Sequence, residues 1–395
     1  MSQVSLMRVP SGFRFAAVSA GIRKDGRIDL ALAVSNERAV AAGVFTRNLV
    51  RAAPVEVAMR RVVAGRARAV LVNAGCANAC TGAPGEAATL GSTAAVARAL
   101  GVEPDEVLPA STGVIGALLP ADEIAAKAGE LVAGLSVEGW DAFSRAILTT
   151  DRGPKLASAE LPGGGSVLGI AKGAGMIHPD LGPPHATMLA FLFTDARVEH
   201  AALQRVLEAA SELTFNAASV DGDTSTNDTV LALASGKSGS APTEAELGAA
   251  FQSVCGELAR AMVADGEGAN HVAEIVVTGL GDAAAARIVA RTVATSLLVK
   301  TALFGNDANW GRLLAAAGRA GVAFDPRRAE IRVNDVVIVE GGVAVGTDAE
   351  KRAAEILAGP SYTITLALGD GPGRASYLTS DLGHGYVDVN AGYRS

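Results

Sequence analysis

A chain of 395 residues is longer than one hydrophobic core usually spans, so its length predicts two or three domains. Hydrophobic residues make up 49% and charged residues 19%, which excludes an extended disordered protein and favours a packed one. The formal net charge of −7 comes with no basic stripe, which argues against nucleic acid as the main partner.

The N-terminal segment and the cysteines bear on compartment and metals. Residues 1–15 contain no long apolar stretch, and no run reaches the ~18 apolar residues that a membrane span needs. We therefore expect a cytoplasmic protein with no membrane partner. Cys76 and Cys80 could begin a zinc site, but no second Cys or His pair completes one. We expect two small buried thiols there and no metal.

The first half of the chain alternates short strands with helices. Residues 69–72 predict a strand, which a Gly-, Asn- and Cys-rich turn follows up to Gly82. Ala and Leu repeat at helical spacing over residues 86–100, and Gly101 supplies the stop. The next elements are predicted to be helices at 121–133 and 138–148, then a hairpin formed by 156–161 and 167–171.

The second half begins with a short apolar run, residues 187–194, whose length suits a buried strand better than a helix. Two helices are predicted near 199–213 and 243–263. From about residue 273 the pattern restarts, with a strand at 274–277 and a helix at 283–293. We interpret this part as a second, smaller α/β domain.

Residues 111–116, STGVIG, combine two hydroxyl side chains with two glycines. Backbone N–H groups of such a loop can face a ligand, and donors aimed at a developing oxyanion are often the largest single catalytic contribution. A plain tight turn explains the segment equally well.

A loop rich in glycine and proline, residues 172–186, delivers Thr187 to the start of the predicted buried strand. A hydroxyl in this position can attack the preceding carbonyl by an N→O acyl shift, and water can then cut the ester. Thr187 would become a new N-terminus, and its α-amino group, with an ordinary pKa of ~7.7–8.0, could act as base for its own hydroxyl. Taken alone, however, a threonine that opens a strand is nearly always structural.

Two acidic segments could bind a ligand or could simply form turns. Residues 220–228 resemble a calcium loop only superficially, because the alternating acids and the distal Glu are missing. A polar turn that hydrogen-bonds its own backbone is the favoured interpretation. In residues 265–268, DGEG, a carboxylate between two glycines could bind a substrate cation or merely belong to a turn that ends a helix.

Together these segments closely resemble one family, the ornithine acetyltransferases, also called glutamate N-acetyltransferases. The resemblance is collinear from Gly12 to the end of the chain. It rests on segments 111–116 (STGVIG), 149–151 (TTD), 172–177 (KGAGMI), 186–189 (ATML), 214–216 (TFN), 221–228 (DGDTSTND), 265–268 (DGEG), 309–312 (NWGR) and the tail from Asp381 to Tyr393.

The resemblance implies a role for individual residues. Autocleavage would separate Ala186 from Thr187, which then becomes the nucleophile. Thr112 and Gly113 would form the oxyanion hole. The residues implied to bind substrate are Thr149, Lys172, Thr187, Glu267, Asn390 and Ser395.

The resemblance also implies the architecture: an α/β protein with layers α-β-β-α, an N-terminal-nucleophile-like site, and a smaller C-terminal α/β domain. Residues 1–186 would form the α chain. The β chain would complete the main domain with residues 187–274 and form the smaller domain with 275–395. The two chains would stay together as an α2β2 heterotetramer.

The implied reaction is ping-pong transfer of acetyl from N-acetylornithine to glutamate, which releases ornithine and uses no cofactor. Whether acetyl-CoA is a second donor stays open. Two other functions also stay open. A self-cleaving aminopeptidase or amidase would release free acetate, and a non-catalytic amino-acid-binding protein would remain uncut.

Overall fold

The computed structural model describes residues 7–182 and 188–392. They form two compact units. The first comprises the described residues up to Asn216 together with Asp223–Met262, and the second comprises Ala217–Gly222 and the described residues from Val263 onwards. The boundary expected at residue 275 falls inside a strand of the second unit. The division into an α and a β chain at residue 187 stays a prediction.

The described part of the first unit is built on a nine-stranded sheet in which the order along the main path is β4-β3-β2-β10-β8-β6-β5. Strands β1 and β7 pair with β2 beside this path. The strands are β1 (Phe13–Val18), β2 (Leu30–Thr46), β3 (Arg66–Cys76), β4 (Val107–Val114), β5 (Lys155–Glu160), β6 (Ser166–Lys172), β7 (Leu181–Gly182), β8 (Leu189–Thr194) and β10 (Thr229–Ala234).

Strand β2 belongs to two halves of this sheet. Its residues 30–35 pair with β1, whereas residues 40–45 pair with β10. The two halves face each other, because Phe13 and Phe15 of β1 pack edge-on against Phe193 of β8, with ring centroids 5.2 and 5.1 Å apart. Such edge-to-face pairs stabilise a core beyond the area they bury.

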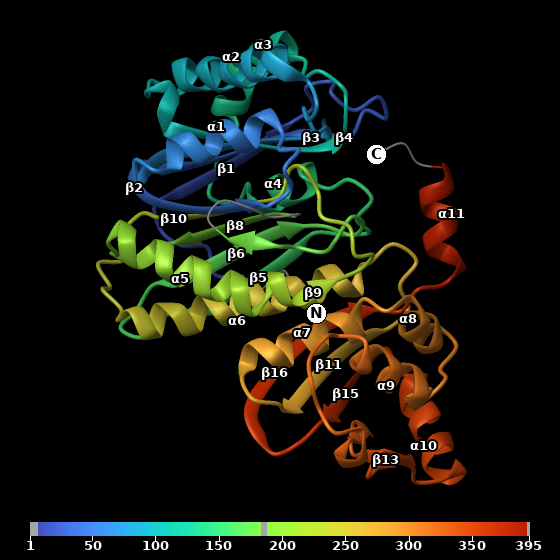
Figure 1. Ribbon diagram of the computed structural model, residues 1–395. Coiled ribbons are helices and arrows are strands. Elements are labelled where there is room, and N and C mark those ends of the chain that lie inside the picture. Colours follow the sequence, from blue (N-terminus) through green and yellow to red (C-terminus); the bar gives the residue numbers. More distant parts are fainter. Residues whose placement is uncertain (1–6, 183–187, 393–395) are drawn as a thin grey trace. The chain divides into compact units, whose positions relative to one another are not determined.

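Helices cover the outer face of each half (Figure 1). On one side, α2 and α3 pack on β2, β3 and β4 through a cluster that includes Val96, Ile124 and Leu71. On the other side lie α5 and α6, and α1 and α4 add residues to the central core. The helices are α1 (Ala53–Val62), α2 (Gly82–Leu100), α3 (Ala121–Ala133), α4 (Trp140–Ala146), α5 (His200–Leu213) and α6 (Glu244–Ala264). This confirms the predicted α-β-β-α layering.

The second unit contains a seven-stranded sheet in its described residues, in the order β14-β13-β12-β15-β11-β16-β9. Its strands are β9 (Ala218–Ser219), β11 (Val272–Gly279), β12 (Glu330–Val333), β13 (Val336–Glu340), β14 (Val343–Ala344), β15 (Ser361–Ala367) and β16 (Gly371–Ser380). Its helices are α7 (Ala283–Ala294), α8 (Leu297–Phe304), α9 (Trp310–Gly318), α10 (Thr347–Leu357) and α11 (His384–Gly392). This confirms the prediction that the C-terminal part of the chain folds as a smaller α/β domain. Within the described ranges, no helix combines the length and apolar character needed to cross a membrane.

Candidate active site

Strand β4 ends in the predicted oxyanion segment. Thr112 and Gly113 lie opposite Ala74 and Gly75 of the parallel strand β3, and the register shifts between Gly75 and Cys76. Gly113 has a φ of 132°, and a Cβ atom there would lie 2.3 Å from the carbonyl carbon of Gly75. Only glycine therefore fits, because both the conformation and the close approach exclude a side chain.

Lys172, the last residue of β6, brings the predicted residues of the first unit together. Its Nζ donates to Oγ1 of Thr149 at 2.7 Å and to Oγ1 of Thr112 at 3.3 Å. The side chain of Lys172 is only 10% exposed. Three residues that are far apart in the sequence are thus in contact: Thr112 near the end of β4, Lys172 at the end of β6, and Thr149 shortly after α4.

The buried carboxylate of Asp151 contacts the residues that hold Lys172 and Thr149 in place. It is fully buried, pairs with Nζ of Lys155, and lies 3.8 Å from Nζ of Lys172. It also accepts the backbone N–H groups of Thr149 at 3.0 Å and Gly173 at 2.6 Å. Burial alone would raise the pKa of Asp151, but the ammonium groups of Lys172 and Lys155, and the hydrogen bonds from Lys155 and the Thr149 amide, hold it well below its ordinary value.

The predicted nucleophile, Thr187, and the other side of the cut, Ala186, lie outside the described residues. The strand that follows is as predicted, since every residue of β8 is buried. In the antiparallel pairing of β6 with β8, Leu189 lies opposite Lys172. The chain therefore enters β8 beside the residue that carries the Thr149 and Thr112 contacts.

In the second unit, Glu267 and Asn390 form a pair. Nδ2 of Asn390, on α11, donates to Oε2 of Glu267 at 2.8 Å. Gly268 has a φ of 71°, and a Cβ there would lie 2.2 Å from the backbone nitrogen of Tyr386. This close approach explains why the loop needs glycine beside the glutamate. Ser395 lies outside the described residues.

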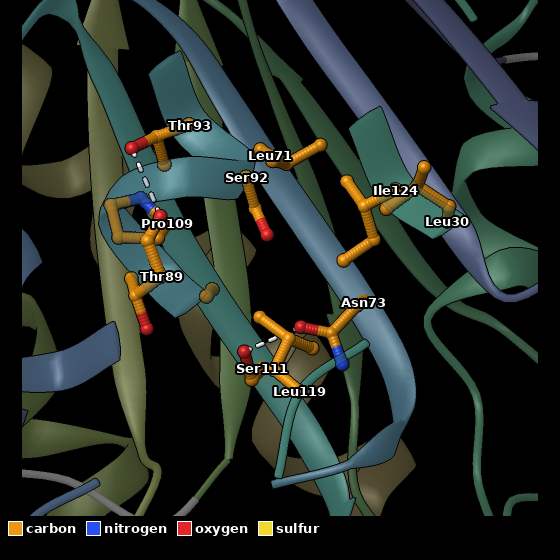
Figure 2. A pocket seen from close by; sticks show the side chains of 11 residues that line it. Leu30, Leu71, Asn73, Thr89, Ser92, Thr93, Pro109, Ser111, Leu119 and Ile124 are labelled. Atoms are coloured by element: carbon orange, nitrogen blue, oxygen red, sulfur yellow. Dashed lines mark hydrogen bonds between the residues drawn. The ribbon is translucent and has the colours of Figure 1, made fainter. Parts of the chain in front are cut away.

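A small cavity lies behind the oxyanion segment, between strands β3 and β4 and helices α2 and α3 (Figure 2). Its volume of about 10 Å³ suits about one water molecule. Two of its lining side chains are hydrogen-bonded to each other, with Oγ of Ser111 donating to Oδ1 of Asn73 at 2.5 Å. Nδ2 of Asn73 in turn donates to the carbonyl of Cys76 at 2.8 Å.

One expectation about the cysteines is wrong. Cys76 is buried, and burial raises the pKa of its thiol. Cys80, however, is exposed. It lies in the turn before α2, where its backbone has a left-handed φ of 58°. Among the described residues, no group of three or more His, Cys, Asp or Glu side chains could hold a metal ion.

Sequence reasoning did not assign a role to Asp151 or Lys155. Both lie within or next to a motif used for the resemblance, but nothing in their spacing indicates that they are buried. Asp151 pairs with Lys155 and lies 3.8 Å from Nζ of Lys172, which is 21 residues further along the chain. The pairing of β5 with β6, in which Lys155 lies opposite Ala171, and the hydrogen bond from the Gly173 amide to Asp151 bring them together.

The comparisons with known proteins agree with this geometry. The model of the ArgJ family matches residues 14–395. The arginine biosynthesis bifunctional protein ArgJ of Geobacter sulfurreducens is 47% identical over 393 residues, covering 97% of this chain and 99% of that protein. The ArgJ protein of Nitratidesulfovibrio vulgaris is also 47% identical over 393 residues, with coverages of 98% and 99%. The crystal structure of the argJ protein from Bacillus halodurans is 38% identical, with a TM-score of 0.50, and covers 52% of this chain and 100% of its own.

Replacing Asp151 by asparagine should strongly destabilise the protein, because two buried ammonium groups lose their counter-charge. Breaking a buried ion pair in this way costs about 3–5 kcal/mol. Because the folded-state pKa is lowered, the stabilisation is fully present above the unfolded-state pKa of ~3.9 and is lost as pH falls through the lower folded-state pKa. Denaturant unfolding should therefore show a constant difference between wild type and variant from about pH 7 to about pH 5.

The matched control is Asp141→Asn, which removes an exposed carboxylate paired with Arg145 on α4. Such a surface pair contributes only about 0.3–0.5 kcal/mol. A difference for Asp151→Asn that is as small as the control, or one that already shrinks near about pH 6, would contradict the low folded-state pKa.

Proposed function

We propose a function for this chain, which belongs to the ArgJ family, since the family model matches residues 14–395. The chain transfers an acetyl group from N-acetylornithine to glutamate, a step of arginine biosynthesis. The observation that carries this proposal is the convergence of Lys172, Thr149 and Thr112 next to the backbone amide of Gly113. A buried cation and an oxyanion-type loop at one place suit an acyl donor that also has a carboxylate.

Each of these groups has a distinct chemical task. The ammonium of Lys172 and the hydroxyl of Thr149 suit the carboxylate of an amino-acid substrate, since charge-assisted hydrogen bonds are the strong ones. The Thr112 hydroxyl and the Gly113 N–H suit the oxygen of a tetrahedral intermediate. Because Lys172 donates to both threonines, the binding and oxyanion groups are held in one network before substrate arrives.

The nucleophile in this proposal is Thr187, freed by cleavage of the Ala186–Thr187 bond. Its hydroxyl attacks the acetyl carbon, the C–N bond to ornithine breaks, and the hydroxyl proton passes through the Thr187 amine to the leaving amine. The amine of glutamate then attacks the acetyl ester, which gives N-acetylglutamate and restores the hydroxyl. A cut near mid-chain agrees with the Bacillus halodurans structure, whose whole chain matches only 52% of this one.

Membership of the ArgJ family also bears on the second acetyl donor, the assembly and the compartment. The relatives are named bifunctional, so we include acetyl-CoA as a second acetyl donor. We propose that no other cofactor takes part, that the cut chains assemble as an α2β2 heterotetramer, and that the enzyme works in the cytoplasm. A self-cleaving hydrolase is the competing function, and the ratio of acetylglutamate to free acetate formed from acetylornithine separates the two.

The test of the proposed function uses acetylornithine labelled in the acetyl group, with glutamate as acceptor. Wild-type protein should place the label in acetylglutamate rather than in acetate. Thr112→Ala should lower kcat by about 10²–10³, the usual loss for one oxyanion donor, while KM changes little. A raised KM with an unchanged kcat would show that Thr112 only binds substrate, and label recovered mainly in acetate would favour the hydrolase.

Glu267 is proposed to bind the side-chain ammonium of acetylornithine. Glu267→Gln removes the charge but keeps an oxygen that can accept from Asn390, so the pair seen in the structure can persist. Binding of acetylornithine should weaken by about 1.5–3 kcal/mol, the range for hydrogen bonds to charged groups. Glutamate brings no ammonium on its side chain, so its KM should change less.

The control for this variant is Glu355→Gln, the same chemical change at an exposed position of α10. It should leave the KM of both substrates unchanged. Equal shifts of the two KM values in Glu267→Gln, accompanied by a lower melting temperature, would assign Glu267 to the structure of its turn instead of the ornithine site.

A further inference from the structure

A polar loop, residues 223–228, leads from Gly222 of the second unit to strand β10 and is not used by the mechanism above. We propose that Asn227 in this loop is a positioning residue that fixes the oxyanion end of β4 relative to the start of β8. This inference rests on the proposed function, because it assigns the oxyanion role to Thr112 and Gly113 and the nucleophile to the residue before Met188.

The carboxamide of Asn227 holds the oxyanion strand through two backbone carbonyls. Its Nδ2 donates to the carbonyl of Ser111 at 2.9 Å and to the carbonyl of Ala77 at 2.6 Å. Both partners can only accept, so the amide nitrogen must point at them. Asn227 is 5% exposed, and a buried carbonyl that loses such a donor is costly.

A neighbouring hydroxyl sets the orientation of this amide. Oγ1 of Thr226 donates to Oδ1 of Asn227 at 2.6 Å, and Thr226 is itself buried. The hydroxyl thus occupies the acceptor side of the amide and leaves both N–H groups for the carbonyls of Ser111 and Ala77. Hydrogen bonds at both Oδ1 and Nδ2 therefore determine the orientation of the Asn227 amide.

Directly after this loop, the first residue of β10 contacts the start of β8. The backbone N–H of Thr229 donates to the carbonyl of Met188 at 2.7 Å, and Thr229 lies opposite Leu189 in the parallel pairing of β10 with β8. Oγ1 of Thr229 donates back to the carbonyl of Asn227 at 3.0 Å, so the two residues are also hydrogen-bonded to each other. A single short segment therefore contacts the residue before Thr112 and the residue after Thr187.

The loop is also tied to the segment that precedes the cleavage site. Oγ1 of Thr224 donates to the carbonyl of His178 at 2.8 Å. On the opposite side of the oxyanion strand, Asn73 accepts from the hydroxyl of Ser111 (Figure 2). Ser111 is consequently held through its side chain by Asn73 and through its carbonyl by Asn227, directly before Thr112.

This arrangement has a consequence for the reaction. The oxyanion groups and the nucleophile come from different strands, β4 and β8, which are not neighbours in the sheet. Their separation therefore depends on what bridges the strand ends. A displacement of about 1 Å at a reacting centre can lower the rate by about 10², even when substrate binding is preserved.

The test is Asn227→Ala in the full chain, assayed with acetylornithine and glutamate. We expect kcat to fall by about 10²-fold while the KM of acetylornithine stays within about twofold, because the Lys172 and Thr149 contacts do not involve Asn227. The rate of cleavage into two chains, measured by denaturing electrophoresis, should fall as well. An unchanged kcat would overturn the inference, and so would a rise in KM equal to the loss in kcat/KM.

Thr226→Val is the second variant, because it keeps the β-branched shape and removes only the hydroxyl that orients the amide. It should lower kcat in the same direction by a smaller factor, with an unchanged KM, and it keeps the proposal testable if Asn227→Ala does not fold. A Thr226→Val enzyme with full kcat would contradict the proposal.

The matched control is Asn48→Ala, since the amide of Asn48 also donates to this loop, at the carbonyl of Thr224 and 2.9 Å away. Asn48 contacts neither Ser111 nor Met188, so its loss should leave kcat near the wild-type value. Equal losses of kcat in Asn48→Ala and Asn227→Ala would mean that the loop only needs to be folded, which overturns the positioning role. Wild-type protein without any transferase activity would instead contradict the proposed function.

Discussion

The buried carboxylate of Asp151 is the group on which the arrangement of the candidate site depends. A carboxylate with no exposed surface is stable only if cations and N–H donors replace the water it has lost, and Asp151 has both. Lys155 and the Gly173 amide satisfy one oxygen, while the Thr149 amide and Lys172 lie at the other. Lys172 is thereby held where it reaches the hydroxyls of Thr149 and Thr112.

The layered fold explains why Asp151, Lys172 and Thr112 lie close together. Strands β4, β6 and β8 belong to facing halves of one sheet, and β2 is shared by both halves. Segments that the sequence separates widely therefore reach the same region at their strand ends. Bridging contacts then set the distances between strands that are not paired, which is the task we assign to Asn227 and which Asp151 performs for Lys172.

Much of the fold could be predicted because local signals and packing agree. The helix expected at 121–133 is α3, and the short apolar run at 187–194 contains the fully buried β8. Residues 220–228 do bond their own backbone, as expected, but Asn227 also bonds two other segments. That role, like the burial of Asp151, arises from contacts between distant segments, and composition and periodicity carry no signal for such contacts. The exposure of Cys80 was missed for a related reason, because its residue type favours burial and the place of its turn in the fold depends on tertiary packing.

We propose that Thr187 carries the acetyl group during the reaction. This can be tested by mass spectrometry of the purified protein after incubation with acetylornithine in the absence of glutamate, followed by proteolysis. We expect one added acetyl group on the peptide that begins at Thr187, and we expect it to disappear when glutamate is added. An uncut, active chain, or an acetyl group on a different residue that glutamate removes, would contradict the proposal.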